Sequence, residues 1–274
     1  MAIGWESIRK QKKLIIKTTI AFMPIASKLQ YASINPSRLN DEQRKTLLEE
    51  IDVLLENAWG KFDINFLENH TLTSEQITTA RIGGELIGFC AINKKKILNK
   101  VVHYIEFTVI RKDFQKLGLG TRLSFLALRR IMLKNIFQII FKPIEIMFIT
   151  PNIRVLAKVA ALADFVYPNP YEADKTTGKI AFADDETWGM ARELIKISDN
   201  PNRRLDREGL VLHGSYSSMP WLIYDIDKIP WHRKDIINKF ARRHLSYGKK
   251  EDKEFVVRVR VDILTLIKLS ILLV

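Results

Sequence analysis

One stretch of the chain decides the fold prediction, and it reads Thr108-Val-Ile-Arg-Lys-Asp-Phe-Gln-Lys-Leu-Gly-Leu-Gly-Thr121. Its first residues end an apolar, β-branched run at 101–110 that is typical of a strand. Its last residues open a helical periodicity that continues to about Asn135. A glycine-containing turn between a strand and a helix directs backbone N–H groups and the positive end of the helix dipole toward one point. The stretch therefore predicts a phosphate cradle, with a plain strand-to-helix turn as the alternative.

Two common phosphate-binding loops do not fit this turn. A Walker loop needs Gly-x-x-x-x-Gly-Lys-Ser/Thr, and the segment Gln115–Gly120 lacks the first glycine and the lysine. A Rossmann turn needs Gly-x-Gly-x-x-Gly, but its third glycine is replaced by Leu123. The remaining pattern is Gln-x-x-Gly-x-Gly, in which a side chain at either glycine would hold a phosphate away from the backbone.

The segments on both sides of the turn predict an α/β sheet domain. In the middle of the chain the order is strand, strand, strand, helix, strand, helix. The expected strands are 77–82, 86–92, 101–110, 144–149, 210–213 and 254–261. The expected helices are 41–59, 119–135, 152–163, 185–197 and 231–245. Gly83 and Gly84 supply the turn of a hairpin between the first two strands.

The pattern of Gln115–Gly120 resembles the cofactor motif of the GNAT superfamily of N-acetyltransferases, Arg/Gln-x-x-Gly-x-Gly/Ala. The approach loop before it is similar to the family's, although Lys112 stands where proline is frequent. The strand at 144–150, followed by Asn152, resembles the family's next strand and helix. The resemblance covers residues 41 to about 167 and implies a GNAT-like α/β fold, a mixed, mostly antiparallel sheet flanked by helices.

This fold gives an expected domain organisation. We expect a basic N-terminal lead-in at 1–40 and one GNAT-like domain at 41–274. The core of that domain would span 41–167. A C-terminal elaboration at 166–250 would carry the acceptor site, and the last strand at 254–261 would complete the sheet.

The resemblance implies acetyl-CoA, or another acyl-CoA, as the cofactor. Backbone groups of Thr108, Val109 and Ile110 would hold its pantetheine arm. The residues implied to surround its pyrophosphate and the rest of the cofactor are Gln115, Lys116, Leu117, Gly118, Leu119, Gly120, Thr121 and Asn152. Independently of the family, residues 94–134 contain eleven Lys and Arg against two acids, which favours binding of phosphate groups.

Acyl transfer to an amine needs a group that takes the amine's proton and a group that protonates the departing thiolate. Glu106 is the candidate base, because it is a lone acid in an apolar strand that leads to the cofactor loop; a structural carboxylate is the alternative. Many family members have, at the position of Val159, a tyrosine that acts as the general acid. Tyr167 is the nearest substitute, with water as the other proton donor and a packing tyrosine as the plain alternative.

These residues predict an enzyme, an N-acyltransferase in which an amine attacks acyl-CoA directly. The acceptor amine, on a small molecule or a protein, is not identified by the sequence. The alternative is a catalytically weak or inactive GNAT-like module that binds nucleic acid or an acidic protein. A basic helix at 231–245 favours an anionic partner, since residues 228–250 carry eight Lys and Arg against one acid.

Composition limits the kinds of disulfide, metal site and membrane segment that the chain can contain. The 274 residues carry a formal charge of +13 and a single cysteine, Cys90, which excludes a disulfide framework and cysteine-based zinc sites. We expect no metal site and a cytoplasmic protein. The apolar run at 263–274 is interrupted by Lys268 and is shorter than the ~20 residues that a membrane-spanning helix needs. It predicts a buried last strand or helix, with contact to a membrane interface as the alternative, and the segment 12–26 is interpreted as a non-cleaved N-terminal segment.

Overall fold

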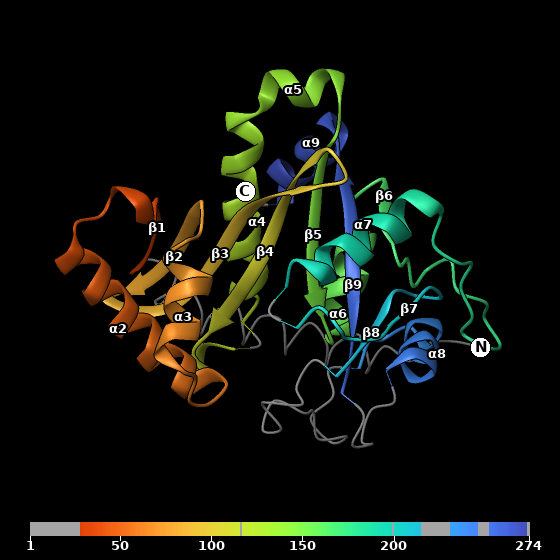
Figure 1. The fold of residues 1–274 in the computed structure, drawn as a ribbon, viewed down its shortest axis with the longest axis horizontal. Coiled ribbons are helices and arrows are strands. Elements are labelled where there is room, and N and C mark those ends of the chain that lie inside the picture. Colours follow the sequence, from red (N-terminus) through yellow and green to blue (C-terminus); the bar gives the residue numbers. More distant parts are fainter. Residues whose placement is uncertain (1–27, 116, 199, 215–230, 246–251, 273–274) are drawn as a thin grey trace, which may run out of the picture.

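The computed structural model describes residues 28–115, 117–198, 200–214, 231–245 and 252–272, and one sheet organises them (Figure 1). Within these residues the strands are β1 (Leu29–Ile34), β2 (Gln76–Ile82), β3 (Glu85–Ile97), β4 (Lys100–Ile110), β5 (Ile144–Thr150), β6 (Phe165–Tyr167), β7 (Leu205–Asp206), β8 (Val211–His213) and β9 (Lys253–Val261). Their order is β1-β2-β3-β4-β5-β9-β8-β7, and β6 also pairs with β9. Only the β4–β5 pair among these is parallel. The predicted mixed, mostly antiparallel sheet is confirmed.

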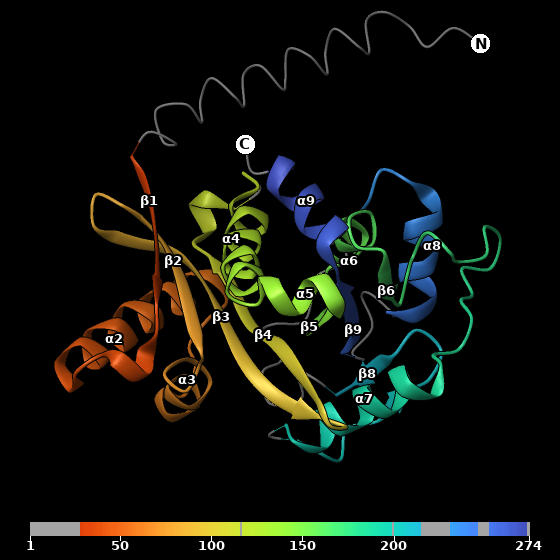
Figure 2. The ribbon, with the colours of Figure 1, turned by 90° about the horizontal axis from the view of Figure 1, so that it is seen from above.

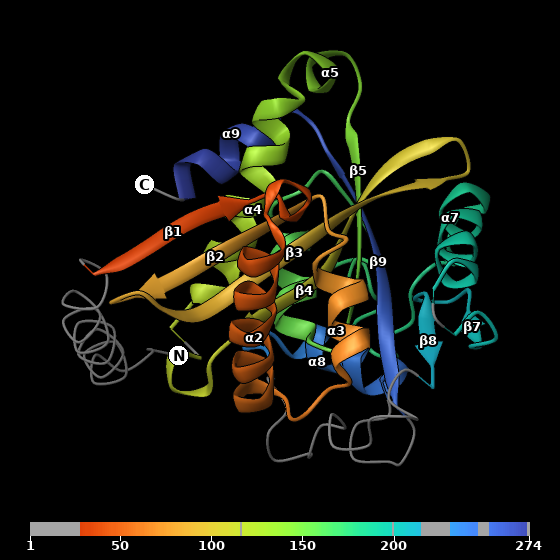
Figure 3. The same cartoon turned by 60° about the vertical axis from the view of Figure 1, so that its left-hand side comes forward.

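Helices cover both faces of the sheet (Figure 2). Their bounds are α2 (Asp41–Ala58), α3 (Ile64–Thr71), α4 (Leu119–Lys134), α5 (Ile136–Phe141), α6 (Ile153–Ala160), α7 (Asp185–Lys196), α8 (Asp235–His244) and α9 (Ile263–Leu272), with short 3₁₀ turns at Pro36–Arg38 and Lys112–Phe114. On one face α4, α5, α6, α8 and α9 share a single apolar core. On the other face α2 and α3 pack on β2–β4, and α7 forms a separate core over β5, β8 and β9 (Figure 3).

Local sequence explains where these elements begin. Asn40 starts α2 with a capping box, in which its side chain accepts from the N–H of Gln43 and the Gln43 side chain accepts from the N–H of Asn40. Gly83 and Gly84 both adopt positive φ, which the tight turn between β2 and β3 requires. The predicted hairpin is therefore present.

The structure contains elements that the sequence-based prediction lacked. β1 pairs with β2 as a strand of the sheet, although it lies in the stretch expected to be a lead-in. α3 and α5 have eight and six residues, and both were not predicted because such short segments show little periodicity. The C-terminal apolar run forms α9, which packs on α4 and β9, in line with the expected buried strand or helix. The predictions for residues 1–27 lie outside the described residues.

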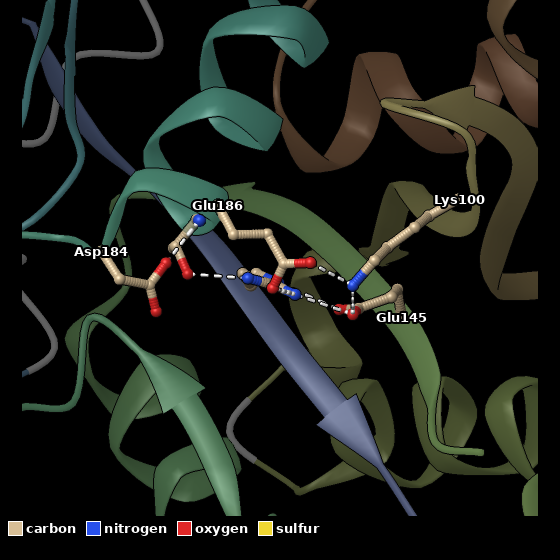
Figure 4. Close-up of polar contacts among 6 residues, drawn as sticks. Lys100, Glu145, Asp184 and Glu186 are labelled. Carbon is tan, nitrogen blue, oxygen red and sulfur yellow. Dashed lines mark hydrogen bonds and ion pairs between the residues drawn. The ribbon is translucent and has the colours of Figure 1, made fainter.

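A buried charged cluster attaches α7 to the sheet (Figure 4). Arg258 on β9 is completely buried, and its guanidinium donates to both carboxylate oxygens of Glu145 on β5, at 3.0 and 2.8 Å. It also donates to Thr187 Oγ1 and to Glu186 Oε2 at the start of α7, each at 2.8 Å. Hydrogen bonds from Lys100 and Arg258 lower the pKa of Glu186 to about 2. The cluster therefore joins β4, β5, β9 and α7 at one point.

We expect Arg258→Met to lower the free energy of unfolding by about 3–5 kcal/mol, because it leaves the Glu145 carboxylate buried with Lys100 as its remaining cation. Urea unfolding followed by circular dichroism measures this loss. Arg260→Met is the matched control. Arg260 lies on the same strand with its guanidinium over the Phe165 ring, and its replacement should lower the free energy of unfolding by less. Equal stability of the Arg258 variant and wild type would contradict a stabilising role for the cluster.

Candidate active site

The candidate site begins where the parallel strands β4 and β5 stop pairing. Their ladder covers only Val102–Ile105 and Glu145–Phe148, although β4 continues to Ile110. The N–H of Arg111 donates to the carbonyl of Ile87 on β3 at 3.0 Å. Since backbone groups alternate sides along an antiparallel ladder, those of Thr108 and Ile110 point away from β3, toward the side of β5, and those of Val109 point to β3. This edge of β4 can hydrogen-bond an extended ligand.

The start of α4 lies directly beyond that edge. Gly118 is its N-cap with a φ of +80°, no side chain caps the helix, and its first turn contains no acidic residue. The N–H of Arg122 donates to the Gly118 carbonyl, so the N–H groups of Leu119, Gly120 and Thr121 precede the first intrahelical bond. With the helix dipole, these three groups form a site suited to an anion such as pyrophosphate.

The remaining predicted cofactor residues belong to the loop before α4 and to the start of α6. Gln115 Nε2 donates to the carbonyl of Ile110 at 2.9 Å, which fixes the loop to the end of β4. Leu117 is partly buried and packs against the main core. Asn152 caps α6, where its Oδ1 accepts from the N–H of Arg154 at 3.0 Å. Lys116 lies outside the described residues, and the roles of these residues toward a cofactor stay predictions.

Glu106 is the extra residue of a β-bulge in β4. Phe107 pairs with Ala91 and Ile105 pairs with Ile92, so Glu106 has no partner of its own on β3. The bulge turns Glu106 and Phe107 to the same face of the sheet, where Phe107 packs in the α2–α3 core and Glu106 contacts α3. Without the bulge, the strict alternation of a regular strand would place Glu106 and Phe107 on opposite faces.

The Glu106 carboxylate is nearly buried and is held at both oxygens. Its side chain is 8% exposed, and Oε1 lies 2.7 Å from His70 Nδ1, which must carry the hydrogen because a carboxylate only accepts. Asn93 Nδ2 donates to Oε2 at 2.8 Å, and Lys95 Nζ lies 3.9 Å from the same oxygen. This arrangement fixes the carboxylate in position, as a catalytic base requires.

A polar pocket of about 460 Å³ opens onto this carboxylate. Its lining residues are Asn69, His70, Thr73, Glu75, Asn93, Lys94, Lys95 and Glu106. Glu106 lies two residues before Thr108, about 7 Å along the strand from the first predicted pantetheine contact. The sequence did not indicate His70, Asn93 or Lys95 as site residues, because α3 was not predicted and the contact of His70 with Glu106 spans 36 positions.

Tyr167, the predicted acid, stands at the end of β6 with its hydroxyl among backbone groups of three segments. The hydroxyl donates to the carbonyl of Ala181 at 2.8 Å, with the carbonyl of Arg207 at 3.3 Å, and it accepts from the N–H of Gly209 at 3.1 Å. Burial, above all, raises its pKa to about 12. These contacts connect β6 with the loops around Ala181 and Gly209, and they favour the alternatives of a packing tyrosine and of water as the proton donor.

We expect Tyr167→Phe to lower the free energy of unfolding by about 1–3 kcal/mol, because the N–H of Gly209 loses its acceptor. We expect the rate of acyl transfer per folded molecule to change less than about twofold, since the hydroxyl proton is held by Ala181. Urea unfolding and single-turnover kinetics measure the two effects. A fall of about 100-fold in rate at unchanged stability would establish Tyr167 as the acid instead.

In the part of the chain that the structure describes, no group of three or more His, Cys, Asp or Glu side chains is placed to hold a metal ion. Of the helices in that part, none has the length and apolar character of a membrane-crossing segment.

Three solved structures similar to this chain are acetyltransferases of low identity. A GNAT family N-acetyltransferase from Escherichia coli in complex with CoA is 12% identical with a TM-score of 0.34, over 44% of this chain and 62% of that chain. An aminoglycoside acetyltransferase from an uncultured soil metagenomic sample is 15% identical with a TM-score of 0.32, over 40% of this chain and 74% of the other. A ribosomal-protein-alanine N-acetyltransferase from Brucella melitensis biovar Abortus 2308 is 15% identical with a TM-score of 0.29, over 39% and 72%.

No curated protein matches this chain. Part of the chain matches a protein family by its sequence. Residues 40–141, from the N-cap of α2 to the end of α5, match the acetyltransferase (GNAT) family. They include the end of β4 that does not pair with β5, the Gln115–Gly120 loop and α4. Residues 40–141 of this chain are therefore a GNAT acetyltransferase domain.

Proposed function

We propose that the protein transfers an acyl group from acyl-CoA to an amine that enters the pocket at Glu106. The observation that carries the proposal is the uncapped start of α4 beside the unpaired edge of β4, within a GNAT domain. Three N–H groups of α4, with no acid in its first turn, fit the pyrophosphate of coenzyme A. When bound, acyl-CoA supplies an acyl group activated as a thioester.

The proton of the attacking amine goes to the Glu106 carboxylate, and water protonates the departing thiolate as the thioester bond breaks. Glu106 is held between His70 and Asn93, so its oxygens keep a fixed direction toward the pocket. The hydrogen bond to His70 lets the imidazole and the carboxylate share an incoming positive charge. A backbone N–H on the β5-facing edge of β4 is placed to donate to the acyl oxygen as negative charge develops there.

A direct attack by the amine fits the environment of the chain's one cysteine. Cys90 is completely buried on β3, and burial raises the pKa of its thiol to about 11. At neutral pH it is therefore a protonated thiol without access to an acyl donor, and an acyl-cysteine route is disfavoured.

The alternative of a basic module that binds nucleic acid or an acidic protein finds less support. Its best surface was the basic helix α8, but the arginines there have partners within the chain. Arg243 donates to Glu208 at 2.9 Å, and the Arg242 guanidinium lies 4.9 Å from the centre of the Trp231 ring. These arginines serve to pack α8, so we retain the enzyme as the proposal.

Thermal-shift titration with acetyl-CoA, coenzyme A and longer acyl-CoAs tests the proposal. We expect coenzyme A and acetyl-CoA both to raise the melting temperature, because both carry the pyrophosphate that α4 would bind. Comparison of chain lengths then identifies the preferred acyl group. No shift at millimolar acetyl-CoA, with a folded protein, would exclude the cofactor and with it the proposed reaction.

A further inference from the structure

A second surface, unrelated to the candidate active site, lies at the opposite end of α4. It is formed by the end of α4, by α5 and by the first turns of α9, and we name it the α5–α9 surface (Figures 1 and 2). Its apolar side chains and their exposed fractions are Leu133 (52%), Phe137 (81%), Ile140 (55%), Phe141 (88%), Leu264 (57%) and Ile267 (51%). Two adjacent, almost fully exposed phenylalanines are unusual for a surface that contacts only water.

Sheet register brings α5 and α9 together. Ile144, which begins β5 three residues after Phe141, pairs with Val261 at the end of β9, and Leu264 follows three residues later. Ile139 of α5 and Leu266 of α9 are both buried in the core that α4 also lines. The exposed side chains Phe137, Ile140 and Phe141 of α5 and Leu264 and Ile267 of α9 are therefore left on the outside of one region.

The α4–α5 side of this surface is basic, whereas Asp262 and Asp164 lie at the start of α9. Residues 114–144 contain no Asp or Glu and six cations, of which Arg129, Arg130, Lys134 and Lys142 are exposed next to the apolar residues. A second copy of the chain docked symmetrically here would bring these cations face to face with no acid from this segment between them. An acidic lipid surface instead offers a phosphate layer to the cations and an apolar layer to the phenylalanines.

We propose that the α5–α9 surface docks this protein on a bilayer that contains anionic phospholipid. Phe137 and Phe141 enter the boundary between headgroups and acyl chains, and the cations of α4 and the α5–β5 turn contact the phosphates. The contact is peripheral, since α5 has only six residues. α4 has sixteen residues, about 24 Å, between this surface and the start of the helix, so docking leaves the proposed coenzyme A site open.

Sedimentation of the full chain with lipid vesicles tests this proposal without use of the acyltransferase activity. We expect about tenfold or more tighter binding to phosphatidylcholine vesicles that contain phosphatidylserine than to pure phosphatidylcholine, and weaker binding as salt rises. Phe137→Ser with Phe141→Ser should reduce binding about tenfold or more. Phe182→Ser is the matched control, because Phe182 is 68% exposed and lies outside the surface, and it should bind like wild type.

Three results would overturn the proposal. Wild type that fails to bind phosphatidylserine vesicles at low salt has no such lipid contact. A Phe137/Phe141 double variant that is folded, by its melting curve, and binds like wild type places the lipid contact elsewhere on the chain. Analytical ultracentrifugation that finds a dimer abolished by the same double variant, without vesicle binding, assigns the surface to a second copy.

Discussion

Gly118→Asp is expected to weaken acetyl-CoA binding by about 100-fold or more. A carboxylate at the N-cap of α4 would accept from the N–H groups that the pyrophosphate needs, and its charge would repel the phosphates. A Cβ at Gly118 has no atom within 4 Å, so the effect would come from the carboxylate and not from a clash. Isothermal titration calorimetry measures the loss directly.

Matched controls separate the anion site from backbone strain. Gly118→Ala introduces the same strain at positive φ without the charge, and should bind acetyl-CoA more tightly than Gly118→Asp. Gly84→Asp places a carboxylate at a similar φ of +89°, also in open space, but in the β2–β3 turn, and should leave binding unchanged. Equal affinity of wild type and the Gly118→Asp variant would refute a cofactor site at the start of α4.

Glu106→Gln is expected to lower kcat by about 100-fold to 10⁴-fold, because the amide cannot take the proton of the amine. The KM for acetyl-CoA should stay within about threefold, since the N–H groups of α4 are unaffected. The acidic limb of the pH–rate profile should disappear. Steady-state kinetics over a range of pH, with a primary amine acceptor, measure all three.

His70→Ala serves as the companion to Glu106→Gln. It removes the donor to Oε1 but retains the carboxylate, so we expect a smaller loss of kcat than in the Glu106 variant. Normal turnover in Glu106→Gln, together with lower stability, would instead make Glu106 a structural carboxylate that joins β4 to α3.

The part of the fold that sequence predicts well is the part determined by local chemistry. The glycine turn, the strand before it and the amphipathic α4 occupy the predicted positions, because turn residues and periodicity act over a few residues. β1 was not predicted, because its sequence, LQYASI, shows only a weak alternation of apolar and polar residues. Its place in the sheet is set by pairing with β2 rather than by its own composition. The bulge at Glu106 also depends on the partner strand, so its facing direction could not be predicted.

The burial of Arg258 also could not be predicted from the sequence. The alternation of β9 places Phe255, Val257, Val259 and Val261 on one face, and that prediction is consistent with their burial in the main core. It leaves Arg258 on the other face, where a solvated arginine is the usual expectation. In the structure α7 covers that face and brings Glu186 to Arg258 across 72 positions of sequence. Only the tertiary arrangement reveals the buried cluster.

A crystal structure of the protein with bound acetyl-CoA would show whether the cofactor lies at the start of α4. We expect the pyrophosphate within hydrogen-bond distance of the N–H groups of Leu119, Gly120 and Thr121. We also expect the pantetheine arm along Thr108 and Ile110, with the thioester on the side of the sheet that leads to Glu106. Ordered acetyl-CoA bound away from the start of α4 would contradict this placement of the cofactor.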